Sequence, residues 1–316
     1  MELGKKLFRW LLLTLIPENL LKSIQHKVLF APEIAERGLS LNRLSPIFKV
    51  VSFELRTKCN GKCGFCPVNV FSDPRKDQTM SIDLFEKVVD ELAEIKFTGR
   101  IAFFNNNEPL IVKNLVSYVR IARKKLQDAS VFHISTNGVS LTPELGLALL
   151  EAGINRFTIN VYNDNLEAPL PRRVVEFERI ASQFNQGLSS TKQVAVEISR
   201  RLENEILDNK GGYSPNKQDT RSIGLRGFCL QPFTILCIDP VGKVSLCCSD
   251  TFAEVEMGDV AKEHLIDIWQ GEKFVNYRRA LLSGGRYSLD FCSNCDYLGI
   301  GARPGWGKRL VSFATK

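Results

Sequence analysis

Hydrophobic and polar positions follow two alternating rhythms between residues 50 and 200. Short β-branched runs predict strands, which read VVSFEL, RIAFF, SVFHIST, NRFTINVY and KQVAVEIS in chain order. Amphipathic stretches between these runs predict helices over 81–95, over 115–126, from Thr142 onwards and over 173–184. Ser81 is a predicted N-cap, and Pro143 suits the first turn of its helix. Five or six such units predict an α/β fold with a parallel sheet, open or closed into a partial (β/α)6 barrel.

The pattern changes after residue 201. A polar stretch rich in Gly and Asn predicts a linker over 206–226. FTILCIDPVGKVSLCC, residues 233–248, reads as two strands joined by a DPVG turn, and a helix is predicted over 262–282. The predicted domains are a core over 49–205 and a small cysteine-bearing domain over 227–316.

Residues 1–48 form a predicted N-terminal helical extension. The apolar run from Leu7 to Ile16 is interrupted by Arg9 and stopped by Pro17, so it is too short to span a bilayer. One interpretation is a helix that packs on the protein's own barrel. The alternative is a basic amphipathic helix that touches a membrane surface or a partner through residues 5–16. The expected location is cytoplasmic, and peripheral to the membrane under the alternative.

The net charge is +7, from 42 basic and 35 acidic residues. Lys and Arg are spread along the chain without a block of five, and no basic stripe carries interleaved aromatic residues. The charge pattern therefore predicts a largely solvated surface and no nucleic-acid partner.

The nine cysteines fall into two groups. Cys59, Cys63 and Cys66 lie directly after the first predicted strand, and the other six lie between residues 229 and 295. This distribution favours metal-binding or catalytic thiols in a reducing compartment over a disulfide scaffold. Three thiolates can hold a four-iron cluster and leave one iron open to another ligand. A zinc knuckle and buried thiols are the structural alternatives.

The first group resembles the loop of the radical S-adenosylmethionine (SAM) superfamily, which has an aromatic residue before its third cysteine, as Phe65 is here. NNNEPLI stands where the family has Gly-Gly-Glu-Pro, with Asn106 and Asn107 in place of the glycines and Glu108 retained. STNG and INVYN follow later strands at places where the family contacts SAM. The resemblance implies SAM contacts from Phe65, Asn106, Asn107, Glu108, Ser135, Asn137 and Asn160. It also implies a [4Fe–4S] cluster with an open iron, a 5′-deoxyadenosyl radical, and a reductant such as flavodoxin or ferredoxin.

The second group resembles the shortened SPASM, or twitch, domain of the same superfamily. The resemblance implies one auxiliary [4Fe–4S] cluster held by Cys229, Cys247, Cys292 and Cys295. A four-thiolate zinc site is the alternative. Cys237 is predicted to be a small buried residue. Cys248, next to Cys247 in a predicted strand, should point the other way and is a candidate thiol for returning a hydrogen atom to a substrate radical.

Several functions fit this scaffold. A dehydrogenase would pass an electron to the auxiliary cluster, an epimerase would use Cys248, and a peptide maturase would modify a precursor peptide. Residues 1–48 are too short and too apolar for the recognition domain common in peptide maturases, which favours a small sugar-like or aminocyclitol-like substrate. An iron–sulfur electron carrier is the non-enzymatic alternative, and it does not need an open iron. His133, in a predicted core strand, is expected to be a structural histidine.

Overall fold

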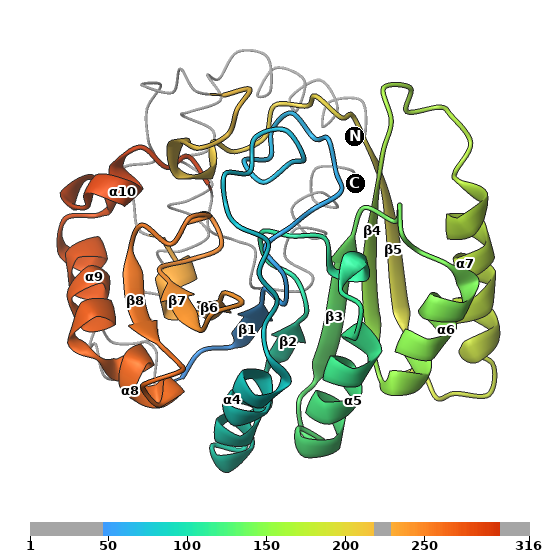
Figure 1. Ribbon diagram of the computed structural model, residues 1–316, viewed down its shortest axis with the longest axis horizontal. Coiled ribbons are helices and arrows are strands. Elements are labelled where there is room, and N and C mark those ends of the chain that lie inside the picture. The colour runs from blue at the N-terminus through green and yellow to red at the C-terminus, as the bar shows by residue number, and fades with distance from the viewer. Residues whose placement is uncertain (1–46, 218–228, 298–316) are drawn as a thin grey trace, which may run out of the picture.

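The computed structural model describes residues 47–217 and 229–297 (Figure 1). The membrane-contact prediction for residues 5–16, and nearly all of the predicted N-terminal extension, lie outside the described residues. No helix within the described ranges is long and apolar enough to cross a bilayer.

The strands are β1 (Val50–Phe53), β2 (Arg100–Ala102), β3 (Val131–Thr136), β4 (Arg156–Tyr162), β5 (Ala195–Arg201), β6 (Ile235–Ile238), β7 (Lys243–Ser245) and β8 (Glu256–Asp259). The α-helices are α4 (Ile82–Glu94), α5 (Leu115–Lys125), α6 (Pro143–Ala152), α7 (Arg172–Phe184), α8 (Leu265–Gln270), α9 (Glu272–Ser283) and α10 (Asp290–Ser293). Short 3₁₀ turns are η1 (Pro109–Ile111), η2 (Lys210–Gly212), η3 (Gln231–Phe233) and η4 (Arg286–Ser288).

These strands form one sheet in the order β5-β4-β3-β2-β1-β6-β7-β8. Strands β1 to β5 are parallel, β6 runs parallel to β1, and β7 and β8 are antiparallel additions at the edge. The predicted α/β fold with a C-terminal hairpin is confirmed. Val50 pairs with Arg100 on one side and with Ile235 on the other, so the sixth parallel strand comes from the predicted small domain. All four residues of β6 are buried, as expected of a strand inside a parallel sheet.

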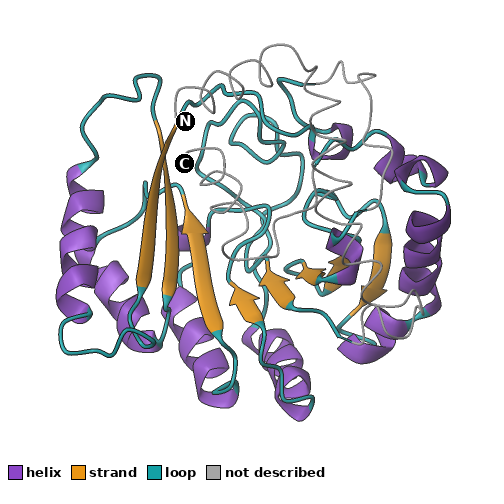
Figure 2. Ribbon diagram, turned by 180° about the vertical axis from the view of Figure 1, so that it is seen from behind, coloured by secondary structure: helices purple, strands orange, loops and turns teal. Residues whose placement is uncertain are grey.

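Helices α4 to α7 cover one face of the sheet (Figures 1 and 2). The two predicted caps are present, because the hydroxyl of Ser81 accepts from Leu84 N and that of Thr142 accepts from Leu145 N. Helix α7 packs on the sheet through Phe177, whose ring lies 4.7 Å from that of Phe157 in β4. The helix-side face of the strands is therefore the hydrophobic core.

The opposite face of the same strands is polar. Since strand side chains alternate, Phe132 and Ile134 join the core while His133 between them points to the other side. The strand register places a row of polar side chains on that inner face: Ser52, His133, Ser135, Arg156, Thr158, Asn160, Tyr162, Glu197 and Ser199. A parallel sheet with one polar face is suited to enclosing a polar ligand.

Three local predictions are wrong or incomplete. The helix predicted over 262–282 is two helices, α8 and α9, separated at Gly271, where a Cβ would lie 2.7 Å from Asp267 O. The second hairpin strand ends at Ser245, before the adjacent cysteines. Strand β8 was not predicted, because its sequence EMGD lacks the β-branched residues typical of strands.

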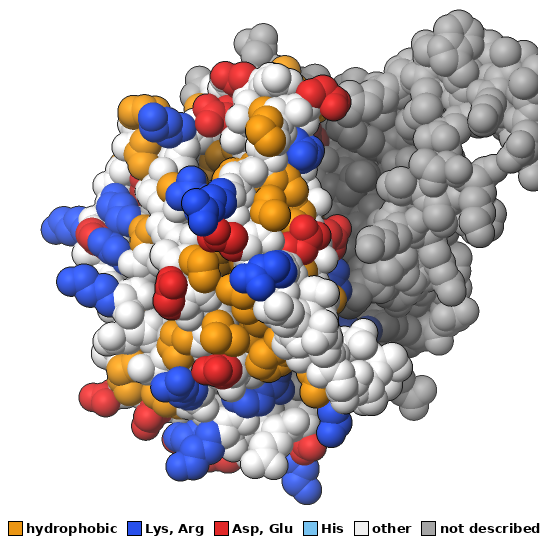
Figure 3. Space-filling view, turned by 90° about the vertical axis from the view of Figure 1, so that its right-hand side faces the viewer, with side chains coloured by type: hydrophobic (Ala, Val, Ile, Leu, Met, Phe, Trp, Pro, Cys, Tyr) orange, Lys and Arg blue, Asp and Glu red, His pale blue; other side chains and the backbone are white. Residues whose placement is uncertain are grey.

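The surface over the right-hand side of Figure 1 is chemically mixed. On this face, Lys and Arg side chains are interspersed with Asp, Glu and hydrophobic ones (Figure 3). Exposed hydrophobic side chains of the described surface include Val139, Leu147 and Val175, which are 50%, 39% and 48% exposed.

Candidate functional site

The first cysteine loop follows β1 at the carboxyl edge of the parallel strands. A Cβ added to Gly61 would lie 3.3 Å from Cys59 Sγ and 3.8 Å from Cys63 Sγ, so both sulfur atoms turn toward one small residue. Asn69 holds the loop by donating from Nδ2 to Cys63 O at 3.2 Å and to Cys66 O at 2.9 Å. This compact loop fits a group bound by three sulfur atoms.

Cys63 of this loop is buried, and Cys59 and Cys66 are partly buried. Burial raises the pKa of the Cys59 and Cys63 thiols to about 12, and it also raises the pKa of Cys66. All nine cysteines are free rather than in disulfides. Because a thiolate is the form that ligates metal, cluster assembly here must release protons.

Glu108 connects the ends of two neighbouring strands. Its buried carboxylate accepts from Thr136 Oγ1 at 2.5 Å, from Asn137 N at 2.8 Å and from Leu110 N at 3.0 Å. Asn137 in turn donates from Nδ2 to Asn60 Oδ1 at 2.8 Å, and Asn60 lies within the cysteine loop. Glu108 thus aligns the segment after β3 with the cysteine loop.

The two asparagines before Glu108 differ in their environment. The backbone N of Asn106 donates to Glu54 Oε2 at 3.1 Å, and its carbonyl oxygen accepts from Arg75 at 2.9 Å. Asn107 keeps a buried Nδ2 without a hydrogen-bond partner. A free amide donor beside the predicted SAM segment fits a bound carboxylate, which is one of the groups that SAM presents.

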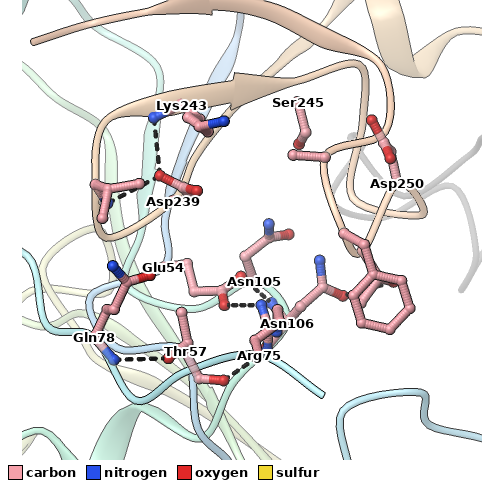
Figure 4. A pocket seen from close by; sticks show the side chains of 14 residues that line it. Glu54, Thr57, Arg75, Gln78, Asn105, Asn106, Asp239, Lys243, Ser245 and Asp250 are labelled. Carbon is pink, nitrogen blue, oxygen red and sulfur yellow. Dashed lines mark hydrogen bonds and ion pairs between the residues drawn. The ribbon is translucent and has the colours of Figure 1, made fainter. Parts of the chain in front are cut away.

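Glu54, which is buried, and Arg75, which is partly buried, form an ion pair next to this segment, with 2.5 Å between Arg75 Nη1 and Glu54 Oε1. Burial raises the pKa of Glu54 to about 7, even though the guanidinium lowers it. The pair borders a cavity of about 200 Å³, across which Asp239 and Lys243 of the β6–β7 hairpin face Glu54 and Asn105 (Figure 4). The hairpin therefore adjoins the predicted SAM segment directly.

A second cavity, of about 280 Å³, opens beside the cysteine loop. Its lining residues are Asn60, Gly61, Lys62, Cys63, Asn137, Gly138, Val139, Val161, Tyr162, Pro171, Arg173, Val174 and Glu203. Of the predicted SAM contacts, only Asn137 lines it. Ser135 and Asn160 pair with each other on the inner face, with 3.3 Å between Asn160 Nδ2 and Ser135 Oγ. Phe65 packs its ring 5.8 Å from that of Tyr162.

The second cysteine group is buried around an arginine. Each of the four predicted ligands Cys229, Cys247, Cys292 and Cys295 is 7–8% exposed. Arg286 is 1% exposed, donates from Nη1 to Cys295 O at 3.2 Å, and keeps Nε and Nη2 without partners. Buried, unbonded N–H groups next to unpaired thiols fit a bound anionic cluster, whose sulfur atoms accept hydrogen bonds.

The segment predicted as a linker contacts both cysteine groups. Asn209 N donates to Asp296 Oδ1 at 2.7 Å, and Asn209 Nδ2 donates to Asn294 O, within the Cys292–Cys295 loop. At its other end, Ser214 Oγ donates to Phe65 O at 3.0 Å. We call residues 208–217 the bridging segment.

Cys248 borders both the second cysteine group and the inner-face cluster, since its thiol lies within electrostatic range of Cys229 and Cys247. Its sulfur packs against the inner-face cluster that contains Ala102 and Cys237, and lies 3.7 Å from Gln231 Oε1. Since β7 ends at Ser245, strand alternation does not decide where Cys248 points. Cys237 is fully buried within this cluster.

Two sequence profiles match the chain. The radical SAM superfamily profile matches residues 54–180, and the SPASM iron–sulfur cluster-binding domain profile matches residues 229–296. The chain belongs to the radical SAM superfamily and carries a C-terminal SPASM domain. Its cofactors are accordingly a [4Fe–4S] cluster with SAM, and iron–sulfur in the SPASM domain.

Relatives extend this similarity over most of the chain. The S-adenosyl-L-methionine-dependent 2-deoxy-scyllo-inosamine dehydrogenase of Niallia circulans is 26% identical over 257 residues, which are 81% of this chain and 96% of that one. The GTP 3′,8-cyclase of Aquifex aeolicus (strain VF5) is 31% identical over 182 residues, 53% of each chain. The crystal structure of BtrN in complex with AdoMet and 2-DOIA has a TM-score of 0.65 at 26% identity, covering 79% of this chain and 94% of that one.

The individual ligand assignments remain predictions. Among the described residues, no three Cys, His, Asp or Glu side chains already stand at metal-binding geometry. The structure also places five residues at these sites that were not predicted from the sequence: Glu54, Asn60, Arg75, Asn209 and Arg286. Asn60 could have been found from its place inside the cysteine motif, whereas Arg286 has no local sequence signal.

Proposed function

We propose that this protein is a radical SAM dehydrogenase that oxidises an alcohol of a small sugar-like or aminocyclitol-like molecule. One auxiliary [4Fe–4S] cluster, held by Cys229, Cys247, Cys292 and Cys295, would supply the electron acceptor. The observation that carries this proposal is the group of four buried thiols around the unbonded N–H groups of Arg286. The similarity to a 2-deoxy-scyllo-inosamine dehydrogenase over 96% of that protein supports the substrate class.

Each part of the first site has a proposed task. Cys59, Cys63 and Cys66 would hold a [4Fe–4S] cluster, which with SAM supplies a radical able to abstract hydrogen from a C–H bond. Glu108 orients Asn137 against the cysteine loop through its hydrogen bonds. Asn107 offers its free Nδ2 to a carboxylate.

The inner face of the sheet supports a polar substrate. Thr158 Oγ1 pairs with His133 Nε2 at 3.0 Å there, Asn160 Nδ2 donates to Ser135 Oγ at 3.3 Å, and Arg156 keeps a buried Nε without a partner. Burial, with Arg100 and Arg156 nearby, lowers the pKa of His133 to about 3, so its ring is neutral at physiological pH. The ring is held by Thr158 through Nε2, and its Nδ1 has no hydrogen-bond partner, which leaves one ring nitrogen for a hydroxyl group of the substrate.

Epimerisation is the second candidate, and the position of Cys248 favours it. Its partly buried thiol packs against the inner-face cluster, where it could return a hydrogen atom to a substrate radical. Peptide modification is the third candidate, and the similarity to a dehydrogenase of a small molecule over 96% of that protein favours a small-molecule substrate over it.

The test uses full-length protein reconstituted anaerobically, with SAM, a ferredoxin or flavodoxin reductant and a panel of aminocyclitols that begins with 2-deoxy-scyllo-inosamine. Dehydrogenation yields a ketone and one 5′-deoxyadenosine per product, with no solvent deuterium in the product. Epimerisation instead incorporates solvent deuterium at the inverted carbon and requires Cys248. An electron carrier would produce no 5′-deoxyadenosine at all, which would reject both enzymatic proposals.

A further inference from the structure

Arg286 has more hydrogen-bonding capacity than the protein uses. Its guanidinium is almost fully buried, and Nη1 donates to the backbone oxygen of Cys295 at 3.2 Å. Nε and Nη2 have no partner. Burying such donors unsatisfied costs about 1–3 kcal/mol each, so a group that accepts from them would recover this cost.

Arg286 faces the second cysteine group. Burial lowers the pKa of its guanidinium, but Cys229, Cys295, Cys292 and Cys247 together raise it above the ordinary value. All four sulfur atoms are therefore within electrostatic range of one cation. The backbone places it there: Gly285, with φ +65°, starts the short η4 turn that carries Arg286 toward the Cys292–Cys295 loop.

We propose that Arg286 donates its two free N–H groups to sulfur atoms at the auxiliary site and raises the reduction potential of the cluster there. The proposal rests on the proposed function, because it assumes an iron–sulfur cluster at this site. Hydrogen bonds and positive charge stabilise the reduced cluster, which carries one more negative charge than the oxidised cluster. Arg286 is thus a positioning residue that makes this site a better electron acceptor.

A second cation faces the same site from the bridging segment. Burial lowers the pKa of Lys210, but Asp208, Cys248, Cys66 and Cys247 together raise it above its ordinary value. Its φ of +50°, followed by φ +67° at Gly211, shows that a left-handed turn holds it in place.

Arg278 of α9 provides a matched control. It is also buried, at 4% exposure, and it also keeps one nitrogen, Nη2, without a partner. Its guanidinium stacks 4.0 Å from the Trp269 ring and donates to Pro232 O and Trp269 O. Burial alone lowers its pKa, to about 9, with no contribution from a cysteine. Arg278→Met therefore removes a buried cation without removing one that faces the thiols.

The experiment is a redox titration of the auxiliary site, monitored by electron paramagnetic resonance. It uses the full chain with Cys59, Cys63 and Cys66 changed to Ala, so that only the auxiliary site can bind a cluster. Arg286→Met is expected to lower the reduced-to-oxidised ratio at a fixed potential about tenfold, which is 59 mV for a one-electron couple. Arg286→Lys, which keeps the charge, should show a smaller shift. Arg278→Met should show none.

Three results would overturn the inference in distinguishable ways. An Arg286→Met variant that binds about four irons and titrates at the parent potential would reject the role of Arg286 but keep the auxiliary cluster. Equal shifts in Arg286→Met and Arg278→Met would show a nonspecific effect of lost packing. Zinc without iron in the parent protein would reject the proposed function together with the inference. If Arg286→Met loses its iron, the reduction potential of Arg286→Lys decides the question instead, and a value equal to that of the parent would reject the role of Arg286.

Discussion

Ser214 donates a hydrogen bond of 3.0 Å to the backbone oxygen of Phe65, which precedes it by 149 residues. Phe65 stands beside Cys66 in the first cysteine loop, and Ser214 belongs to the bridging segment that also holds the second cysteine group through Asn209. Within this segment, Asn209 and Ser214 are completely buried. The separation between the two cysteine groups is therefore fixed by a segment that packs as tightly as the core.

Replacing Asn209 should weaken the auxiliary site. Asn209→Ala leaves Asn294 O and Asp296 N without their partners, at a cost of about 1–3 kcal/mol for each buried group. We expect this variant to lose iron to a chelator faster than the parent protein does, as measured by visible absorbance. Asn276→Ala, an exposed change on α9, should lose iron at the parent rate. Equal rates in the two variants would contradict a bridging role.

Two adjacent cysteines should behave differently. Cys247→Ala removes a predicted ligand and should lower the iron content by about four per chain. Cys248→Ala should keep the parent iron content, because Cys248 is not one of the four predicted ligands and its sulfur packs against the inner-face cluster. Iron and sulfide analysis of the two variants after anaerobic reconstitution provides the measurement. Iron loss in Cys248→Ala as large as in Cys247→Ala would show that the ligand assignment is wrong.

Glu108 should matter for both stability and SAM binding. Glu108→Gln replaces one accepting oxygen with an amide NH₂, which cannot accept from Thr136 or Asn137. The expected loss is about 1–3 kcal/mol in the free energy of unfolding, together with weaker SAM binding measured by calorimetry. Glu178→Gln, exposed on α7, should change stability by less than about 0.5 kcal/mol. An unchanged SAM affinity in Glu108→Gln would show that the hydrogen bond from Asn137 to Glu108 does not position Asn137 for SAM binding.

Glu54 should make stability depend on pH. Its pKa is about 7 in the folded protein against 4.5 for an ordinary glutamate, so the folded state binds the proton more tightly. The resulting stabilisation is complete below pH 4.5 and is lost as the pH rises through 7. Relative to Glu54→Gln, the native protein should lose up to about 1.4 kcal/mol per pH unit in this window.

Denaturant unfolding of both proteins between about pH 5.5 and 8.5 tests this dependence, with a flat difference expected above the folded pKa. Asp77→Asn is the control, because the ion pair with Arg56 lowers the pKa of exposed Asp77 below its usual 3.8, outside the window. If the free energy of unfolding of the native protein instead rose with pH relative to that of Glu54→Gln, the ion pair with Arg75 would dominate over burial. The predicted sign would then be reversed.

The sequence by itself determined the parts that depend on neighbours in the chain. Strand–helix periodicity identified β1 to β5 and α4 to α7, and the caps at Ser81 and Thr142 are local hydrogen bonds. The spacing of Cys59, Cys63 and Cys66 is a local motif, and it identified the family. These features are readable because the residues that interact lie within a few positions of one another.

Only the tertiary structure decided how distant segments meet. It placed β6 beside β1, which makes the predicted second domain part of the main sheet. It also turned a predicted linker into the bridging segment and brought Arg286 to the four thiols. These contacts join residues far apart in the sequence, and no short-range pattern encodes a partner at such a distance. Burial then gives them their effect, because a cation or hydrogen bond acts more strongly where water is excluded.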